Sequence, residues 1–467
     1  MYQAYIVQID DLRKHPNADR LQIATIFGEN VIVSLDVELG NIGIYFPIGG
    51  QLNERFCDEN HLCRKKSDGT PDSGYLERHQ RAVKAIRLRG EKSEGLFMPI
   101  SSLSYLGVKP GDYKIGTPIT VVNGEEICCK YIPKGNRSRR GNGQSKHSFI
   151  SKRDIAPTFY EHDETEQLAY NHKAFKYGDY IEITLKMHGT SQRTAYVPVL
   201  KDYRTRNPFY AHLIKAYKEN KKIGKFGRKW LKKAFKVATP VYEYDYVSGT
   251  RRTVLDDWDG GFYGSNAFRK QHADFFKGKL QKGETVYYEV VGFTDTGVPI
   301  MPSASNKGLD DDFHKMYGDT TVFSYGCEDK QSDFYVYRMT LVNEDGYVVE
   351  YSPDQIRHRC EQMGCKSVPL LWKGFLFRDK SREHMEANEE EAGKLAQAIA
   401  EEFYDGPDPV GRTHVREGVV VRIVNRPTFK AYKHKNFNFR VLSGMAIDAL
   451  EKSKEIENMS DDILTEV

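Results

Sequence analysis

The chain has 467 residues, with 69 Lys and Arg against 65 Asp and Glu, which gives a net charge of +4. Its 12% of aromatic residues excludes a wholly disordered chain, and its length excludes a small disulfide scaffold. At roughly 150 residues per domain we expect two to four domains. The seven cysteines form no Cys-x-x-Cys pair, and there is no basic leader or long apolar run. These features predict reduced thiols, a cytoplasmic location and no membrane association.

Residues 1–132 contain several short segments that are typical of strands and are separated by Gly, Asn and Asp, namely 4–9, 22–27, 30–35, 42–46 and 117–122. About five short strands in this length predict a small β-barrel. The stretch from Lys14 to Leu21, KHPNADRL, resembles the signature of the OB-fold tRNA-binding modules attached to some tRNA synthetases. The resemblance implies an OB-fold-like, nucleic-acid-binding domain over 1–132. The alternative is an ordinary turn after the first strand.

Residues 133–154 are basic and rich in Gly, Ser and Asn, which predicts a flexible linker. From 155 to 443, strands and helices mix without βαβ alternation, so an α+β domain with antiparallel sheets is expected. The Glu- and Ala-rich stretch 383–404 predicts a helix, and 444–467 predicts a C-terminal helix with an acidic tail.

Positive charge is concentrated in one segment. Residues 201–236 carry 13 Lys and Arg against two acids, a surplus of 11, so the rest of the chain carries about −7. Interleaved apolar residues predict two short amphipathic helices broken near Gly224 and Gly227. Such a basic segment can contact nucleic-acid phosphates, lie on a membrane, bind a calmodulin-like groove or simply be a solvated face.

The segment Lys186-Met-His188-Gly189 follows a strand-like run, 181–185. A lysine at a strand end can be desolvated in a pocket, which lowers its pKa and makes the amine nucleophilic. A glycine nearby allows the backbone to approach a ligand closely. A surface lysine at a strand end is the alternative.

Later segments carry further polar residues in strand-like surroundings. Glu289 lies inside an apolar run, where a carboxylate is costly to bury without a partner. Glu417 precedes Gly418 and a run of valines. In the last of these segments, alternation places Lys433 and Lys435 on one strand face, where two ammonium groups suit triphosphate oxygens. For each of these, an exposed edge strand is the alternative.

Taken in this order, the segments resemble the covalent nucleotidyltransferase superfamily of ATP-dependent DNA and RNA ligases and mRNA capping enzymes. They are most similar to nick-sealing RNA ligases, some of which carry Lys-x-His-Gly. The resemblance implies that Lys186 takes AMP from ATP and that Glu417 holds Mg²⁺ or Mn²⁺. The residues it assigns to nucleotide binding are His188, Gly189, Arg252, Glu289, Tyr337, Lys433 and Lys435.

Within that set, the family pattern places Arg252 on the ribose and the nick, Glu289 on a ribose hydroxyl and Tyr337 on the adenine ring. Many family members have an acid after the aromatic residue, whereas this chain has Arg338, and core packing of Tyr337 is the alternative. Residues 198–240 and 345–405 have no counterpart in the pattern and are expected to be insertions.

The order of the domains narrows the function. Most DNA ligases and capping enzymes place an OB domain after the catalytic domain, whereas only about 25 residues follow the last strand here. The arrangement resembles a small RNA-ligase branch that seals nicks at an RNA 3′-hydroxyl. We therefore predict a monomeric, ATP-dependent RNA ligase acting on nicked RNA or RNA/DNA duplexes in RNA repair, with 201–236 gripping duplex phosphates. The alternatives are a DNA ligase, a capping-type guanylyltransferase and a non-catalytic RNA-binding protein.

Overall fold

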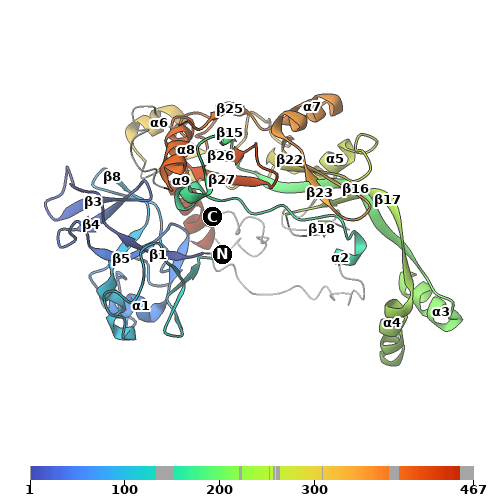
Figure 1. Cartoon of the computed structure of the whole chain (residues 1–467), viewed down its shortest axis with the longest axis horizontal. Coiled ribbons are helices and arrows are strands. Elements are labelled where there is room, and N and C mark those ends of the chain that lie inside the picture. The colour runs from blue at the N-terminus through green and yellow to red at the C-terminus, as the bar shows by residue number, and fades with distance from the viewer. Residues whose placement is uncertain are drawn as a thin grey trace.

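A computed structural model describes residues 2–132, 152–219, 223–251, 253–255, 258, 263, 265–307, 309–377 and 389–452. A β-rich N-terminal region lies at one end of the long axis, and two larger sheets with surrounding helices form the rest (Figure 1). Apart from two short parallel pairings, of β14 with β27 and of β22 with β24, the strands of the two large sheets pair antiparallel. The predicted α+β class with antiparallel sheets is therefore confirmed.

The N-terminal region is built from short strands, as its alternating pattern predicts. A four-stranded sheet has the order β10 (Pro118–Ile119), β1 (Ala4–Gln8), β5 (Ile42–Phe46), β9 (Leu96–Pro99). A three-stranded sheet consists of β2 (Leu12–Lys14), β3 (Leu21–Ile26) and β4 (Glu29–Ser34). Both sheets contribute to one apolar cluster that contains Val7, Ala24, Val31 and Tyr45.

Smaller elements complete this region. They are the strand pairs β6 (Gly50–Leu52) with β13 (Cys128–Lys130), β7 (Ile86–Leu88) with β8 (Glu91–Ser93) and β11 (Val121–Val122) with β12 (Glu125–Glu126), together with helices α1 (Glu54–Glu59) and η1 (Ile100–Leu106). Four of the five segments predicted as strands correspond to β1, β3, β4 and β5. The fifth, 117–122, contains the two short strands β10 and β11 one after the other.

The first large sheet has the order β14 (Glu166–Gln167), β27 (Lys430–Lys435), β26 (Gly418–Ile423), β15 (Tyr180–Leu185), β25 (Leu370–Phe375). Its strands are rich in β-branched and aromatic residues, which favour a pleated, half-buried surface. Helix α8 (Glu391–Glu401) packs Ala392, Ala396 and Ala400 into the same apolar cluster as Val419 and Val421 of β26. This helix falls inside the predicted helix 383–404, of which 383–388 lie outside the described residues.

The second large sheet has the order β18 (Val254–Leu255), β17 (Thr239–Gly249), β16 (Thr190–Arg204), β19 (Glu284–Gly292), β22 (Ser332–Val342), β23 (Val348–Glu350), with β24 (Lys366–Ser367) beside β22. The C-terminal half of β16 and the N-terminal half of β17 extend beyond the sheet as a two-stranded ribbon. This ribbon carries helices α3 (Pro208–Lys218) and α4 (Lys225–Val237) (Figure 1). The two predicted basic helices are thus present, but the break precedes Lys225, and Gly227 lies inside α4.

Local sequence explains the helix that follows β23. Helix α7 (Pro353–Met363) begins after Ser352, whose hydroxyl accepts a hydrogen bond from the Gln355 amide while the Gln355 side chain bonds back to the Ser352 amide. This reciprocal cap satisfies two backbone donors, and proline suits the first helical position. The helix ends at Gly364, whose φ of 73° is left-handed. Segment 345–405, expected to be an insertion, therefore supplies β23, α7, β24, β25 and α8 to the two-sheet body.

The remaining short elements are α2 (Lys152–Ile155), η2 (Leu168–Tyr170), η3 (His172–Ala174), α5 (Ala267–Phe275), β20 (Ala304–Ser305), α6 (Asp311–Tyr317) and β21 (Thr320–Thr321). Of the predicted linker 133–154, only 152–154 are described, and they belong to α2. The linker and the domain boundaries thus stay predictions. Among the described residues, no helix is long and apolar enough to cross a membrane.

The last helix ties the two parts of the chain together. Helix α9 (Phe437–Lys452) begins at Phe437, before the predicted start at 444, because the Asn436 side chain accepts a hydrogen bond from the Phe439 amide at 3.1 Å. From this helix, buried Arg440 Nη1 pairs with Glu29 Oε1 at 2.6 Å and Glu94 Oε1 at 3.3 Å in the N-terminal region. Residues 453–467, the predicted acidic tail, lie outside the described residues.

Candidate active site

The Lys186–Gly189 segment is the crossover between the two large sheets. Strand β15 ends at Leu185 in the first sheet and β16 begins at Thr190 in the second. The Lys186 amide donates to the Gly418 carbonyl at 3.0 Å, and the Gly189 amide donates to Glu289 Oε1 at 3.2 Å. A Cβ on Gly189 would lie 2.2 Å from the carbonyl oxygen of Val290, so glycine is what lets the chain cross here.

Three predicted residues converge on the carboxylate of Glu417, whose side chain is fully buried. Lys186 Nζ lies 2.9 Å and Lys435 Nζ 3.0 Å from Glu417 Oε1, and His188 Nδ1 lies 3.6 Å from Oε2. Burial raises the pKa of a carboxyl group, but the two ammonium groups outweigh it and hold the pKa of Glu417 at about 2. Glu417 is therefore ionised at neutral pH.

His188 lies behind this cluster. Its ring is packed edge-on between Phe323 and Phe439, with centroids 4.6 Å away on each side. Burial lowers the pKa of His188 to about 3, despite the neighbouring Glu417 carboxylate. The imidazole is thus neutral, and its position supports Glu417.

Lys433 is the third ammonium group of the site. Burial and the positive charges of Lys435 and Lys186 lower the pKa of Lys433 to about 7. Lys186 and Lys435, together with Lys433 where it is protonated, outnumber the one carboxylate of Glu417, and this positive surplus suits a polyanionic ligand.

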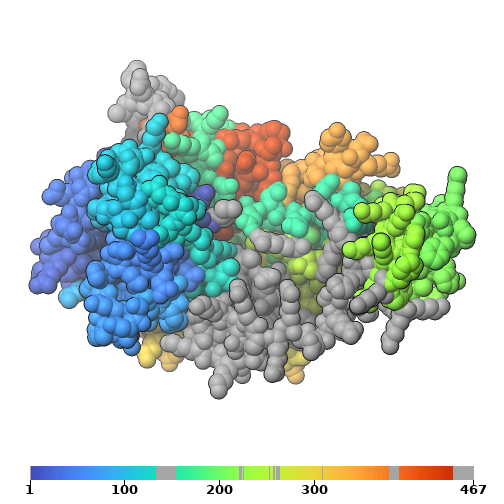
Figure 2. Space-filling view, turned by 90° about the horizontal axis from the view of Figure 1, so that it is seen from below, coloured from blue at the N-terminus to red at the C-terminus, as the bar shows by residue number. Residues whose placement is uncertain are grey.

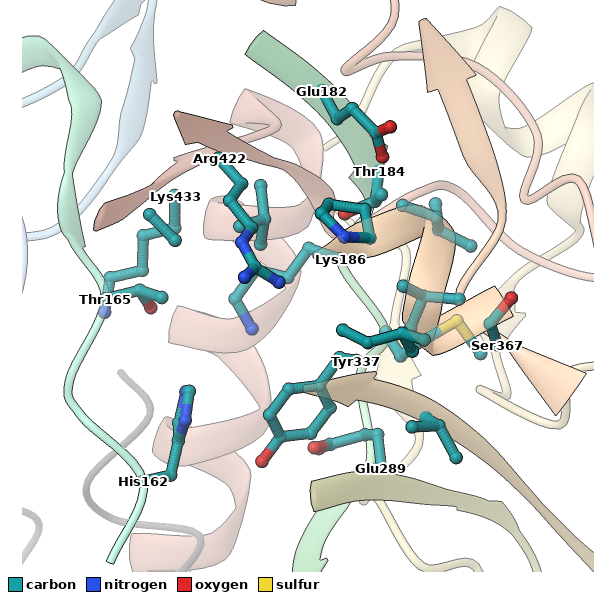
Figure 3. Close-up of a pocket in the computed structure, with 18 of the residues that line it drawn as sticks. His162, Thr165, Glu182, Thr184, Lys186, Glu289, Tyr337, Ser367, Arg422 and Lys433 are labelled. Carbon is teal, nitrogen blue, oxygen red and sulfur yellow. The ribbon is translucent and has the colours of Figure 1, made fainter. Parts of the chain in front are cut away.

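A pocket opens in front of Lys186, and side chains from both sheets face it (Figure 3). Glu289 and Tyr337 line it from the second sheet, opposite Lys433 from the first. Tyr337 Oη is hydrogen-bonded to Ser191 Oγ at 2.8 Å, which fixes the ring orientation. The pocket thus combines an aromatic face, a carboxylate and ammonium groups.

Residues 156–165 run along one side of the pocket as a strap, and His162 and Thr165 of this strap line the pocket (Figure 3). The sequence did not suggest this segment as part of the site. His162 from this strap lies with its ring 5.0 Å from that of Tyr337. Burial and the charges of Arg338, Arg251 and Arg193 lower the pKa of His162 well below its usual range, so the ring is neutral. Arg338 Nη1 lies 3.1 Å from His162 Nδ1. Because arginine only donates, Nδ1 accepts, and the proton sits on Nε2.

Arg338, the departure from the family pattern, holds this strap. Its buried guanidinium pairs with Glu350 through Nε, at 3.1 and 3.0 Å from the two carboxylate oxygens, and donates from Nη2 to Asp163 Oδ2 at 2.9 Å. The same group lies over the rings of Tyr287 and Phe429, 5.0 and 4.5 Å from their centroids. The arginine therefore sits behind the pocket wall and positions the strap.

Other unpredicted charged residues line the pocket. Glu182 of β15 is buried and accepts two hydrogen bonds from Arg357 of α7, at 2.9 and 2.8 Å. Arg422 of β26 donates to the carbonyl of Tyr351 at 2.7 Å. Arg251 also lines the pocket, whereas its predicted neighbour Arg252 lies outside the described residues. The pairing of Glu182 with Arg357 spans 175 residues of sequence, which explains why no local motif signals it.

Comparison with known proteins identifies the family. The RNA ligase family matches residues 179–435, which is more than half of the chain. The chain belongs to the RNA ligase family. The predicted family and enzyme class are therefore confirmed. The matched segment of this RNA ligase starts just before β15 and ends with β27, so it includes the crossover and the three lysines of the site.

Solved structures are similar to this RNA ligase in fold. A mutant RNA ligase of Naegleria gruberi, solved with ATP and Mn, matches with a TM-score of 0.51 at 15% identity, covering 94% of this chain and 99% of that chain. Another structure of the Naegleria gruberi RNA ligase, with PPi, has a TM-score of 0.49 at 15% identity, covering 97% and 99% of the two chains. No curated protein matches this chain.

Proposed function

We propose that this RNA ligase joins strands in an ATP-dependent reaction through a covalent lysyl–AMP intermediate on Lys186. The observation that carries the proposal is the convergence of Lys186 and Lys435 on buried Glu417, beside a pocket with the aromatic face of Tyr337. A nucleophilic amine, phosphate-binding cations and a base-stacking ring are the parts that adenylyl transfer requires. The Naegleria gruberi enzyme, solved with ATP and Mn, supports ATP as the nucleotide.

The chemistry proceeds in three balanced steps. Lys186 first loses a proton to solvent, and its neutral amine attacks the α-phosphorus of ATP; an N–P bond forms while the bond to the bridging oxygen of the β-phosphate breaks, and pyrophosphate leaves. An oxygen of a 5′-phosphate end then attacks the adenylyl phosphorus, the N–P bond breaks, and the amine of Lys186 leaves and takes up a proton. A 3′-hydroxyl finally attacks the 5′-phosphate and gives its proton to solvent, and AMP leaves with the bonding electron pair while a phosphodiester forms. These steps depend mainly on positioning and charge neutralisation.

Each pocket residue has a role in this scheme. Tyr337 stacks on adenine, and Glu289 accepts a hydrogen bond from a ribose hydroxyl. Lys433 and Lys435 bind the phosphate oxygens where negative charge develops. Gly189 holds the crossover against β19, and Arg252 keeps its proposed contact with the ribose and the nick.

Glu417 is the residue that would hold a divalent metal ion. Its carboxylate is fully buried and ionised, which suits a hard cation. Among the described residues, no group of three His, Cys, Asp or Glu side chains could complete a protein-only metal site. This donor set fits Mg²⁺ or Mn²⁺, because Mg²⁺ typically binds one or two carboxylates together with substrate phosphates and water. A bound ion would neutralise charge on the α-phosphate.

For the substrate, we propose a nicked RNA or RNA/DNA duplex with an RNA 3′-hydroxyl, and RNA repair as the role. The N-terminal region supports this, since its short antiparallel strands fit an OB-like module, a common platform for nucleic acids. Arg440 pairs it with α9, which directly follows the Lys433–Lys435 strand. A monomer in the cytoplasm remains our expectation.

The test is incubation with α-labelled ATP, and separately with GTP, followed by denaturing electrophoresis. We expect label from ATP that is lost in Lys186→Ala and kept in the control Lys430→Ala, an exposed lysine on β27. Label that survives Lys186→Ala, or no label at all, would refute the mechanism and favour a non-catalytic protein. Label from GTP alone would favour capping chemistry. Sealing of matched nicks with RNA or DNA on the 3′-hydroxyl side then separates an RNA-end ligase from a DNA ligase.

A further inference from the structure

Residues 197–204 of β16, helices α3 and α4, and residues 239–245 of β17 form a projection that we call the basic arm. Strand β16 pairs with β19 only through Ala195, and beyond it, within the described residues, with β17 alone. Eight strand residues at about 3.3 Å each carry the helices roughly 26 Å beyond that pairing. The basic arm and the N-terminal region extend from the same side of the large sheets, at opposite ends of the molecule (Figure 1).

Most of the apolar surface of the two helices is buried inside the basic arm, although Phe209, Phe226 and Val237 are exposed. Leu213 and Ile214 of α3 form one buried cluster with Leu231 and Ala234 of α4. A helix that lies in a bilayer, or that enters a calmodulin-like groove, must present its apolar face outward. Because most of the apolar surface is buried between the helices, the packing favours a partner of the cationic face over both alternatives.

The outward face of α4 is cationic. Arg228, Lys229, Lys232, Lys233 and Lys236 are all exposed, and their spacing of three and four residues places them on one continuous face. The helix contains no acidic residue. Among the described residues, no ion pair joins these five cations to a carboxylate, in contrast with the lysines at the base of α3 and in the ribbon.

Two lysines of the basic arm outside α4 have carboxylate partners. Lys218 Nζ lies 2.6 Å from Asp202 Oδ1, and Lys201 pairs with Asp245. These two lysines are thus paired with carboxylates of the ribbon, whereas the five cations of α4 face solvent. Closely spaced cations on one face repel one another and favour a polyanion that can neutralise them.

We propose that the basic arm binds the phosphate backbone of duplex RNA at a distance from the nick held at the pocket. This inference rests on the proposed function and adds a contact surface to it. The 13 residues of α4 span about 20 Å. This length spans several base pairs of a duplex. Seen from below, the N-terminal region and the basic arm lie at opposite ends of the molecule (Figure 2).

The experiment measures binding of the full chain to a nicked RNA duplex by fluorescence anisotropy between 50 and 200 mM salt. The arm variant is Lys229→Gln, Lys232→Gln, Lys236→Gln, and a second arm variant has arginine at the same positions. The control removes three exposed lysines outside the basic arm, Lys307→Gln, Lys373→Gln, Lys394→Gln. Each phosphate contact contributes about 0.9 to the slope of log affinity against log salt, so the glutamine arm variant should lower the slope by about 2.7.

This change in slope means that the affinity advantage of the wild type shrinks about 40-fold between the two salt concentrations. The control and the arginine variant should keep the wild-type slope. Unchanged affinity and slope in the glutamine arm variant, or an equal loss in the control, would overturn the inference. Binding to anionic vesicles that the arm variant abolishes, with RNA binding intact, would also overturn it. Labelling of the wild type by α-labelled ATP is measured in parallel, so that a failure of the proposed function is seen separately.

Discussion

Replacing Arg338 with methionine is expected to lower the free energy of unfolding by about 3–5 kcal/mol, chiefly through one of its two carboxylate partners. The Arg338 side chain is 5% exposed and bonds both Glu350, which is 16% exposed, and Asp163, which is 67% exposed. Without the Arg338 guanidinium, the largely buried Glu350 charge loses its hydrogen-bonded partner and keeps only the electrostatic attraction of Arg422, which is costly. Asp163 simply returns to water, so its contact contributes about 1 kcal/mol or less.

Double-mutant cycles measure the two contacts separately. Urea unfolding of Arg338→Met, Glu350→Gln, Asp163→Asn and the two double variants gives each coupling energy. We expect about 2–3 kcal/mol for Arg338 with Glu350 and less than about 1 kcal/mol for Arg338 with Asp163. Equal couplings, or a cost below about 1 kcal/mol for Arg338→Met, would refute the reasoning, because burial would then not decide the strength of these pairs.

The same variant tests the strap. Arg338 holds His162 beside Tyr337, and both of these residues line the pocket. Arg338→Met is therefore expected to raise the KM for ATP in self-adenylylation, with the limiting rate nearly unchanged. A lower limiting rate at constant KM would contradict this assignment.

Three further changes test other parts of the structure. Gly189→Ala places a Cβ 2.2 Å from the Val290 carbonyl oxygen, so we expect a loss of about 1–3 kcal/mol in urea unfolding and weaker self-adenylylation. Burial raises the pKa of Glu94 to about 7, from an ordinary value of 4.5, so the folded protein holds a proton that the unfolded chain releases. The contribution of Glu94 to stability is thus fully present below pH 4.5 and is lost as pH rises through 7, by on the order of 3 kcal/mol. Glu94→Gln should remove this contribution, so the variant should lack the corresponding fall in unfolding curves from pH 5 to 8. The pKa of Lys433 is about 7, so the ammonium group loses its charge between pH 6 and 8.5. ATP affinity, measured by calorimetry, should therefore weaken over this range. The weakening should be much smaller in Lys433→Arg, because the arginine side chain stays charged. A flat wild-type profile would contradict either pH prediction.

The sequence by itself determined the family and predicted the residues of the candidate site. Lys186, Glu417 and the Lys433–Lys435 strand are recognisable because each lies in a short strand-like segment whose alternation is a local property. The period-two alternation of a strand also places Lys433 and Lys435 on one face, and this prediction needs no long-range contact. The charge of the basic arm is likewise a local count, as is the helical content of its two segments.

Only the tertiary structure decided how these parts meet. Arg338 contacts Asp163 across 175 residues of sequence, and this contact brings His162 to the pocket. The structure also decided that the apolar face of α4 is buried against α3, which leaves the cationic face outward. Charge and periodicity are properties of neighbouring residues, whereas partners and burial depend on which distant segments pack together. For that reason the sequence indicated which side chains are candidates for the site, and the fold decided what each of them faces.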